Sequence, residues 1–481
     1  MGPKNLLIIM SDEHSPKILG CYGHPLVRTP HLDAMAAAGT RFTAAYTTSP
    51  VCVPARAAFA VGKYVHQIGF WDNADPYDGS IPSWHHRLRD AGHHVVSIGK
   101  LHFRGGDDYG FDEEIIPMHV IDGKGDLMGL VREDLPERGA SWKIAKWAGP
   151  GESAYTFYDR EIAARAQIWL REEAAKHTQR PWVMFVSFVC PHFPLTAPPE
   201  FYYQYPLDSI VWPKQYGASE RPVHPFLRDY AQSFVYDKYF DETKLRKAIA
   251  GYYGLCSFLD DNIGQVLRAL AEAGLADSTR VLYTSDHGDN LGNRGLWGKS
   301  TMYEETAGVP LIVSGPGIPA GRVVATPTSH VDTYPFILQS VGAPVPADDG
   351  HPGYSLLDIA QGFEPPRTVL CEYHGMGSTT GAFMIRNGRY KYVHYVNYAP
   401  QLFDLSSDPE ELRDLAGDPG YREVLEQCRA RLYEVCDPVD VDRRAKARQR
   451  TLLEENGGRA AVIARGDLGF SPPPGVQPVF E

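Results

Sequence analysis

The sequence NLLIIMSDE at residues 5–13 places an unbroken apolar run directly before acidic residues. Such a run is typical of a short strand buried on both faces of a sheet. Similar short runs, rich in β-branched or aromatic residues, recur at residues 95–98, 182–189, 281–284 and 311–313. We therefore expect residues 5–10 and these later runs to form the strands of one sheet.

Helical patterns lie between the predicted strands. A glycine follows most of them, as at Gly39 and Gly342, and glycine just past a helix is a common stop signal. The expected helices cover residues 31–38, 83–91, 154–175, 245–273 and 333–341. Strands that alternate with helices predict an α/β fold, with a large mixed, mostly parallel sheet flanked by helices.

The pattern changes after about residue 366. Short strands are expected at residues 369–373, 382–386 and 390–395, and Asn387-Gly388 is typical of a tight hairpin turn. This region predicts a smaller C-terminal α+β domain with a short antiparallel sheet. The expected organisation is a main α/β domain at residues 1–366, this smaller domain at 367–440, and a helix with an extended arm at 441–481.

Composition and charge exclude several classes of protein. The 481 residues are 43% hydrophobic and 22% charged, as in a globular protein. The net charge of −12 argues against a nucleic-acid partner. No apolar run reaches the roughly 20 residues of a membrane helix, and the first ten residues are a poor match to a signal peptide. Because the cysteines number only seven, a disulfide framework is not expected, and we predict a cytoplasmic protein.

The pentapeptide Cys52-Val53-Pro54-Ala55-Arg56 predicts the start of a helix, since proline is favoured in the first helical turn. Free N–H groups at such a terminus attract an anion, and Arg56 can reach back toward it. The pentapeptide alone is equally compatible with a buried cysteine beside a structural arginine.

Acidic residues directly follow two predicted strands. Asp12 and Glu13 follow the first strand, and Asp286 and His287 follow the run at residues 281–284. Ligands of open α/β sheets gather at the carboxyl ends of the strands, so these side chains are expected to share a cation. Oxygen ligands suit Mg²⁺, Ca²⁺ or Mn²⁺, and the histidine favours Mn²⁺ or a softer metal.

Basic residues follow the other strands. Lys100 and His102 follow residues 95–98, His192 follows residues 182–189, and Lys299 comes shortly after the Asp-His pair. Each alone could be a satisfied or solvated side chain. Together, around a cysteine and a cation, they predict an anion pocket with general acid–base groups.

The motifs in this order resemble those of the formylglycine-dependent sulfatases, which belong to the alkaline-phosphatase-like superfamily. The resemblance covers nearly the whole chain, and QLFDL at residues 401–405 resembles the family's C-terminal segment. The motifs are the Asp12 strand end, C-x-P-x-R at 52–56 with Gly62 after it, G-K-x-H at 99–102, P-H-x-P at 191–194, S-D-H-G-D at 285–289, and Lys299.

The resemblance implies an alkaline-phosphatase-like fold and roles for Cys52 and a metal. Cys52 would be oxidised after synthesis to formylglycine by a formylglycine-generating enzyme, and Arg56 would hold the hydrated aldehyde that serves as the nucleophile. One divalent cation would be bound, Ca²⁺ or Mn²⁺ with Mg²⁺ as a further candidate. Its expected ligands are the residue at Cys52, Asp12, Asp286 and His287, with Glu13 as an additional candidate.

The resemblance also assigns the groups that handle the substrate, a small-molecule sulfate monoester. Lys100 and Lys299 would grip the transferring sulfate. His102 would accept a proton when sulfate is released, and His192 would protonate the leaving group. We expect Asn73 to add a substrate contact.

Some residues depart from the family's pattern. Ala55 stands where many relatives have Ser, Glu13 replaces a second Asp, and His287 replaces an Asn. The last two resemble the phosphonate monoester hydrolase branch, so a phosphonate monoester or phosphodiester hydrolase with the same nucleophile is an alternative. Two others are an unmodified relative, in which Cys52 stays a thiol that binds an anion, and a two-metal phosphatase.

The last residues read as an extended arm, with Phe470, three prolines at 472–474 and Val479-Phe480. These residues are too apolar for a solvent-exposed, disordered terminus. The arm is therefore expected to dock either on its own chain or on a neighbouring subunit. We expect a homo-oligomer, a dimer or tetramer, in which the arm contacts the partner subunit.

Overall fold

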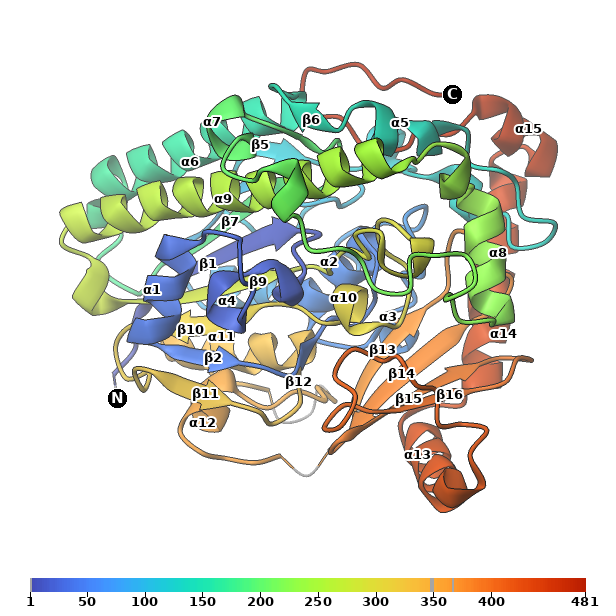
Figure 1. Cartoon of the computed structure of the whole chain (residues 1–481). Helices are drawn as coiled ribbons and strands as arrows, with labels where there is room; N and C mark the ends of the chain where they lie inside the picture. Colours follow the sequence, from blue (N-terminus) through green and yellow to red (C-terminus); the bar gives the residue numbers. More distant parts are fainter. Residues whose placement is uncertain (1, 347–349, 366) are drawn as a thin grey trace.

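A computed structural model of the chain describes residues 2–346, 350–365 and 367–481. Its main sheet has eight strands in the order β11-β2-β10-β9-β1-β7-β4-β5 (Figure 1). They are β1 (Asn5–Asp12), β2 (Thr40–Phe42), β4 (Val95–Lys100), β5 (Glu113–Met118), β7 (Val183–Pro191), β9 (Thr279–Ser285), β10 (Leu311–Ser314) and β11 (Arg322–Val324). Only β10 runs antiparallel to its neighbours. The predicted mixed, mostly parallel sheet is therefore confirmed.

Helices cover both faces of this sheet, and alternate residues of β1 point into the two layers. Leu7 belongs to a core shared with α6 and α9, which lie side by side in Figure 1, whereas Leu6 belongs to a core shared with α2 and α11. Because side chains on both faces are fully buried, the strand is apolar at every position from Leu6 to Met10. The main covering helices are α1 (Pro30–Ala38), α2 (Cys52–Val61), α4 (Trp84–Asp90), α6 (Ala154–Glu172), α9 (Glu242–Glu272) and α11 (Thr333–Val341).

The C-terminal part forms the expected antiparallel sheet, with one strand more than predicted. Its strands are β13 (Val369–Tyr373), β14 (Ala382–Asn387), β15 (Tyr390–Tyr395) and β16 (Gln401–Asp404). The hairpin between β14 and β15 turns at Gly388, whose φ is 57°. The helices that follow are α13 (Arg422–Val435), α14 (Pro438–Glu455) and α15 (Gly458–Arg465). The limits of the three expected domains stay a prediction.

Short elements connect these parts. Two small parallel ladders join β3 to β12 and β6 to β8. The segment at residues 122–150 contains α5 and one strand of the second ladder. The short elements are β3 (Ala45–Tyr46), β6 (Gly149–Pro150), β8 (Thr196–Ala197), β12 (Thr328–Ser329), α3 (Val65–Ile68), α5 (Trp142–Lys146), α7 (Pro199–Tyr202), α8 (Pro225–Phe234), α10 (Glu304–Ala307) and α12 (Leu356–Ala360).

The C-terminal arm, defined as residues 467–481, contacts its own chain, and the expected contact with a partner subunit stays a prediction. Asp467 Oδ1 lies 2.7 Å from Arg138 Nη2, and the Phe470 ring centroid lies 5.4 Å from that of Tyr155. Arg138 is buried, and a buried cation without its counterion is costly. The arm of the same chain thus supplies one of the two carboxylates beside this arginine, and Asp126 supplies the other.

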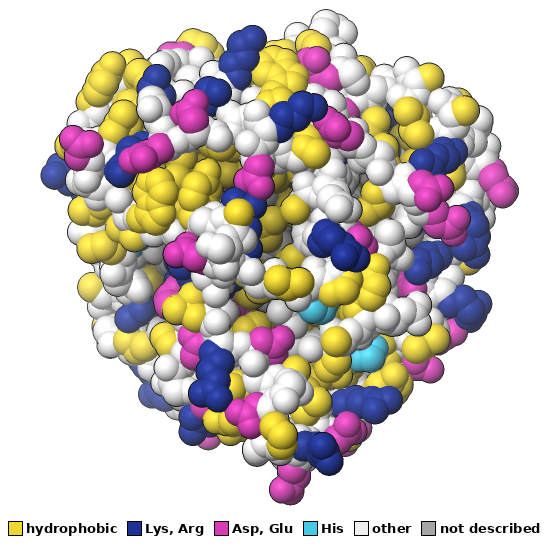
Figure 2. All heavy atoms as spheres, turned by 45° about the vertical axis from the view of Figure 1, so that its right-hand side comes forward, with side chains coloured by type: hydrophobic (Ala, Val, Ile, Leu, Met, Phe, Trp, Pro, Cys, Tyr) yellow, Lys and Arg dark blue, Asp and Glu magenta, His cyan; other side chains and the backbone are white. Residues whose placement is uncertain are grey.

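Charges of both signs are mixed on the face that Figure 2 turns forward, with hydrophobic side chains between them. The net charge of −12 is therefore not gathered into one acidic patch on this face.

All seven cysteines are unpaired. Within the described ranges, every helix is too short or too polar to cross a bilayer.

Gly62, which ends α2, has a φ of 73°, and a Cβ built there would lie 2.4 Å from Tyr334 Cγ. Gly388 has a similar φ of 57° but no atom within 4 Å of its Cβ position. We expect Gly388→Ala to lower the free energy of unfolding by about 1 kcal/mol through backbone strain alone. Gly62→Ala should lose a further ~1–3 kcal/mol through overpacking. Equal losses in chemical denaturation would contradict the packing argument.

Candidate active site

The polar residues at four neighbouring strand ends meet at one edge of the main sheet. Asp12 and Lys100 are the last residues of β1 and β4, while His192 and Asp286 directly follow β7 and β9. These strands are parallel, so their carboxyl ends lie together. Cys52, the first residue of α2, completes the cluster. The structure thus brings together residues that the sequence predicted to converge.

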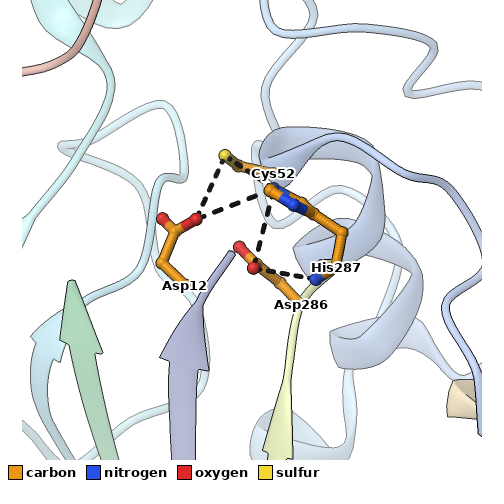
Figure 3. Close-up of side chains that lie close together, drawn as sticks. All are labelled: Asp12, Cys52, Asp286 and His287. Carbon is orange, nitrogen blue, oxygen red and sulfur yellow. Dashed lines mark hydrogen bonds and ion pairs between the residues drawn. The ribbon is translucent and has the colours of Figure 1, made fainter. Parts of the chain in front are cut away.

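Cys52 is the common neighbour of the cluster. Its Sγ lies 3.2 Å from His287 Nε2, 3.6 Å from Asp12 Oδ1 and 3.0 Å from Lys299 Nζ. Figure 3 shows the side chains of Asp12, Asp286 and His287 pointing toward one another and toward this sulfur. Burial and the Asp12 carboxylate raise the pKa of the Cys52 thiol, so the unmodified side chain is neutral.

Arg56 ties the cluster to the sheet. Its Nε donates to Asp286 Oδ2 at 2.8 Å, and its Nη1 donates to Ser187 Oγ and to the Lys100 carbonyl, both at 2.9 Å. Arg56 lies one helical turn after Cys52 on α2, so these bonds also fix the start of that helix relative to the strand ends. Its Nη2 lies 3.8 Å from Asp12 Oδ2.

Two buried lysines flank Cys52. The Lys100 ammonium pairs with Asp12, and Lys299 Nζ lies 3.4 Å from Glu13 Oε2. Burial alone would raise the pKa of Asp12, but Lys100 and the other cations hold it well below its usual range. Burial opposes the charge of Lys299, yet Cys52, Glu13 and Asp12 raise the pKa of that ammonium well above its usual value. Lys299 therefore keeps its positive charge beside Cys52.

Four side chains are arranged to hold a cation. Ligand atoms of Asp12, Cys52, Asp286 and His287 all lie within 4.8 Å of one another, and the four residues are buried. Asp12, Glu13 and His192 form a second such group that shares Asp12. Hard divalent cations prefer carboxylate oxygens, so this donor set suits them.

Glu13 carries the strongest sign that the donor set fits a cation. Its Oε1 is buried without a hydrogen-bond partner in the described part of the chain. Burial raises the pKa of this carboxyl well above its usual range. Its backbone has a φ of 68°, and its N–H donates to Asp286 Oδ1 at 3.1 Å. A residue with a strained backbone and a buried side-chain oxygen that lacks a hydrogen-bond partner is typical of a site that a ligand completes.

Both histidines predicted for proton transfer are buried. His192 Nδ1 lies 2.7 Å from the carbonyl of Phe193, which can only accept, so Nε2 is free to accept from Lys299 Nζ at 2.9 Å. Burial and Lys299 hold the pKa of His192 well below its usual value. His102 has a similarly lowered pKa, because of burial and Lys100. Both rings are therefore neutral in this arrangement.

Asn73 lines the site but has a structural bond. Its Oδ1 accepts from the N–H of Val53 at 3.1 Å, in the first turn of α2. The predicted substrate contact of Asn73 stays a prediction, since capping of α2 already accounts for this oxygen.

Sequence reasoning missed several residues around the site. Ser187 lies inside the apolar run of β7, where nothing in the pattern distinguishes it. Others come from the loop at residues 122–150 and from the C-terminal arm, far away in the sequence. The cavity beside Cys52 is lined among others by Asp126, Arg138, Tyr155, Phe193, Phe234, Tyr236, Leu468, Phe470 and Ser471.

Comparisons with known proteins cover most of the chain. The family model for sulfatases matches residues 4–343, and that described as N-sulphoglucosamine sulphohydrolase, C-terminal, matches residues 292–437. A choline-sulfatase from Rhizobium meliloti (strain 1021) is 34% identical over 436 residues, covering 87% of this chain and 83% of that protein. Arylsulfatase K from Canis lupus familiaris is 31% identical over 448 residues, covering 86% and 79%.

Solved structures share the fold. A phosphonate monoester hydrolase from Agrobacterium radiobacter superposes with a TM-score of 0.74 at 24% identity, covering 90% of this chain and 95% of that one. A 2-O GAG sulfatase superposes with a TM-score of 0.72 at 25% identity, covering 90% and 92%.

The donor set predicts one equivalent of a divalent cation per chain, measurable by elemental analysis of the purified protein. Asp286→Asn should remove the cation and lower activity by several orders of magnitude. Asp260→Asn is the matched control, because Asp260 is a similarly buried carboxyl group whose oxygens accept from the backbone N–H groups of His31 and Leu32. An Asp286→Asn protein that keeps its full metal content would contradict the assignment.

Proposed function

The chain belongs to the sulfatase family of sulfuric ester hydrolases, and we propose that it cleaves sulfate monoesters with a formylglycine made from Cys52 and one divalent cation. The observation that carries this proposal is the position of Cys52, which is buried at the start of α2 between Lys299 and a group of carboxylates. A formylglycine-generating enzyme is the partner that this maturation requires.

A modified Cys52 accounts for the two-step reaction better than the thiol. A formylglycine hydrate carries two hydroxyls, so that one attacks sulfur and deprotonation of the other expels sulfate. Arg56 is rigidly held by Asp286 and Ser187, and it lies one helical turn from residue 52, within reach of an oxygen there. Its role is to orient the attacking group.

We propose that Lys100 and Lys299 bind the oxygens of the sulfate group that is transferred. Both are buried beside Cys52, where Lys100 pairs with the Asp12 carboxylate and Lys299 Nζ lies 3.4 Å from Glu13 Oε2. Ammonium groups held in a dry site stabilise negative charge that develops on the transferring oxygens, with little reorganisation.

His192 and His102 are the proposed proton carriers. His192 Nε2 lies 2.9 Å from Lys299 Nζ, so this nitrogen can take up a proton from the lysine and then deliver it to the leaving oxygen, while Nδ1 stays bonded to the Phe193 carbonyl. His102 is neutral and buried, and it is the proposed acceptor of the proton whose loss releases sulfate.

Asp12, Asp286, His287 and the residue at Cys52 are the proposed metal ligands, with Glu13 as a further one. When bound, the cation lowers the pKa of a coordinated hydroxyl and neutralises charge on the transferring group. Ca²⁺, Mn²⁺ and Mg²⁺ are the candidates. Two carboxylates favour a hard ion, and His287 favours Mn²⁺ among the three.

A second candidate is a phosphonate monoester or phosphodiester hydrolase with the same nucleophile. The fold superposes on a phosphonate monoester hydrolase, and Glu13 and His287 both stand near the cation site. The four anion-facing groups Arg56, Lys100, Lys299 and His192 suit a tetrahedral oxyanion of either element. We rank the sulfate ester first, because both curated relatives described above are named as sulfatases.

The leaving alcohol is proposed to have an apolar or aromatic body. Tyr155, Phe193, Phe234 and Tyr236 line the cavity beside Cys52. Choline sulfate, 4-nitrophenyl sulfate and a 2-O-sulfated GAG fragment are the substrates to compare first, following the names of the similar proteins. We further propose a cytoplasmic homo-oligomer, to be tested by cell fractionation and analytical ultracentrifugation.

Mass spectrometry of the peptide that contains Cys52 tests the proposal. In protein made together with a formylglycine-generating enzyme, the side chain should carry an aldehyde in place of the thiol. Cys52→Ala should abolish turnover of sulfate esters while the thermal midpoint stays close to that of the wild type. An active Cys52→Ala protein would exclude the mechanism, and an unmodified but folded wild type without turnover would favour the anion-binding relative.

His192→Ala should discriminate between leaving groups. Esters of alkyl alcohols, whose pKa is high, need a proton on the leaving oxygen, whereas 4-nitrophenolate does not. We expect kcat to fall about 10²-fold or more for an alkyl sulfate but far less for 4-nitrophenyl sulfate. Equal losses on the two esters would assign His192 to positioning alone.

A further inference from the structure

We infer that the C-terminal arm is a working part of the active site of its own chain, in which Ser471 positions His102 and Phe470 forms a wall against the leaving group. This inference rests on the proposed function. Leu468, Gly469, Phe470 and Ser471 all line the cavity that contains Cys52.

The arm is anchored by a buried ion pair. Arg138 Nη2 lies 2.7 Å from Asp467 Oδ1 and 2.9 Å from Asp126 Oδ2, and the N–H of Ala140 donates to Asp467 Oδ2 at 3.0 Å. Arg138 and Asp467 are only 4% and 2% exposed. If the arm left this position, the buried arginine would keep only one of its two carboxylate partners and the Ala140 N–H would lose its acceptor, so the docked position of the arm is preferred.

The far end of the arm is tied to its start. Asp467 and Glu481 exchange two backbone hydrogen bonds, each of 3.0 Å, and the Glu481 carboxylate lies 3.2 Å from Lys143 Nζ. In Figure 1 the red trace leaves α15, passes over α5 and β6, and returns. A terminal segment frays unless it is tied down, and here both of its ends are.

Phe470 completes the aromatic wall that surrounds His192. Its ring centroid lies 5.4 Å from that of Tyr155 and 5.6 Å from that of Phe193. These two rings in turn lie 5.8 Å and 4.6 Å from the His192 ring. Because His192 faces the leaving oxygen in the proposed reaction, Phe470 lies on the side where the body of the alcohol must sit.

Ser471 holds the other proton carrier. Its Oγ lies 2.9 Å from His102 Nε2, and the Tyr155 hydroxyl donates to the Ser471 carbonyl at 2.5 Å, which fixes the backbone of the serine. His102 Nδ1 is buried and without a hydrogen-bond partner in the described ranges. With Nε2 engaged by Ser471, Nδ1 is the nitrogen left for a proton from the reacting group. Ser471 is therefore a positioning residue.

The path of the chain favours action within one chain. Only Gly466 separates the end of α15 at Arg465 from Asp467, and α15 itself packs against α14. The arm thus starts next to Arg138 and needs no linker to reach His102. A partner subunit could supply the same residues only by an exchange of equivalent arms.

Steady-state kinetics test the two roles. Ser471→Ala should lower kcat about five- to tenfold with little change in KM, as expected for the loss of one hydrogen bond. Ser471→Thr keeps the hydroxyl and should restore most of kcat. Phe470→Ala should instead raise KM for 4-nitrophenyl sulfate about tenfold through lost apolar contact. Val476→Ala is the control, because this arm residue is 46% exposed.

Wild-type kcat and KM in both Ser471→Ala and Phe470→Ala would overturn the inference. Each variant is compared with the wild type on whichever ester the wild type cleaves fastest. Failure of the proposed function therefore appears in the wild type itself, whereas failure of the inference appears only in the ratio of variant to wild type.

A mixed assembly tests whether the arm acts in its own chain. Ser471→Ala and Cys52→Ala chains with different tags are produced together, and complexes that carry both tags are purified. If the arm acts within one chain, kcat per intact Cys52 stays at the Ser471→Ala value. Recovery toward the wild-type value would show that the partner's arm completes the site and would overturn this part of the inference. If no doubly tagged complex forms, the arm can act only within its own chain.

Discussion

The structure depends on a buried set of opposite charges around Cys52. The carboxylates of Asp12 and Asp286 are matched by Arg56 and Lys100, and the Glu13 carboxyl lies beside Lys299, with all of these groups nearly excluded from solvent. Removing one member of such a set typically costs about 3–5 kcal/mol, because its partner stays buried and unpaired. The charges therefore constrain one another, and they leave a cation and a tetrahedral anion as the ligands that fit between them.

The sheet makes this set possible. The register of β1 against β9 pairs Ser11 with Ser285, which brings Asp12 and Asp286 side by side, and β4 and β7 deliver Lys100 and His192 to the same edge. A one-residue slip would turn these side chains to the opposite face. Arg56 then ties α2, and with it Cys52, to the strand ends. The fold and the site are thus specified by the same contacts.

Much of this could be predicted from the sequence. Apolar runs followed by Asp12, Lys100, His192 and Asp286 imply both the strands and the convergence of their ends. Ser187 could not be predicted, because a serine within an apolar strand has no distinctive pattern. Nor could the contact between Ser471 and His102, since they lie 369 positions apart in the sequence and only the tertiary fold brings them together. The arm was expected to dock, but its target depends on the buried Arg138, which local sequence does not reveal.

The central claim is that this pocket transfers a sulfuryl group. Its most direct test compares kcat/KM for 4-nitrophenyl sulfate with that for the 4-nitrophenyl ester of phenylphosphonate, on fully matured enzyme. The two esters carry the same charge and the same leaving group, so only the transferred group differs. The account predicts a higher kcat/KM for the sulfate ester. A higher value for the phosphonate would contradict it and would identify the chain as a phosphonate monoester hydrolase.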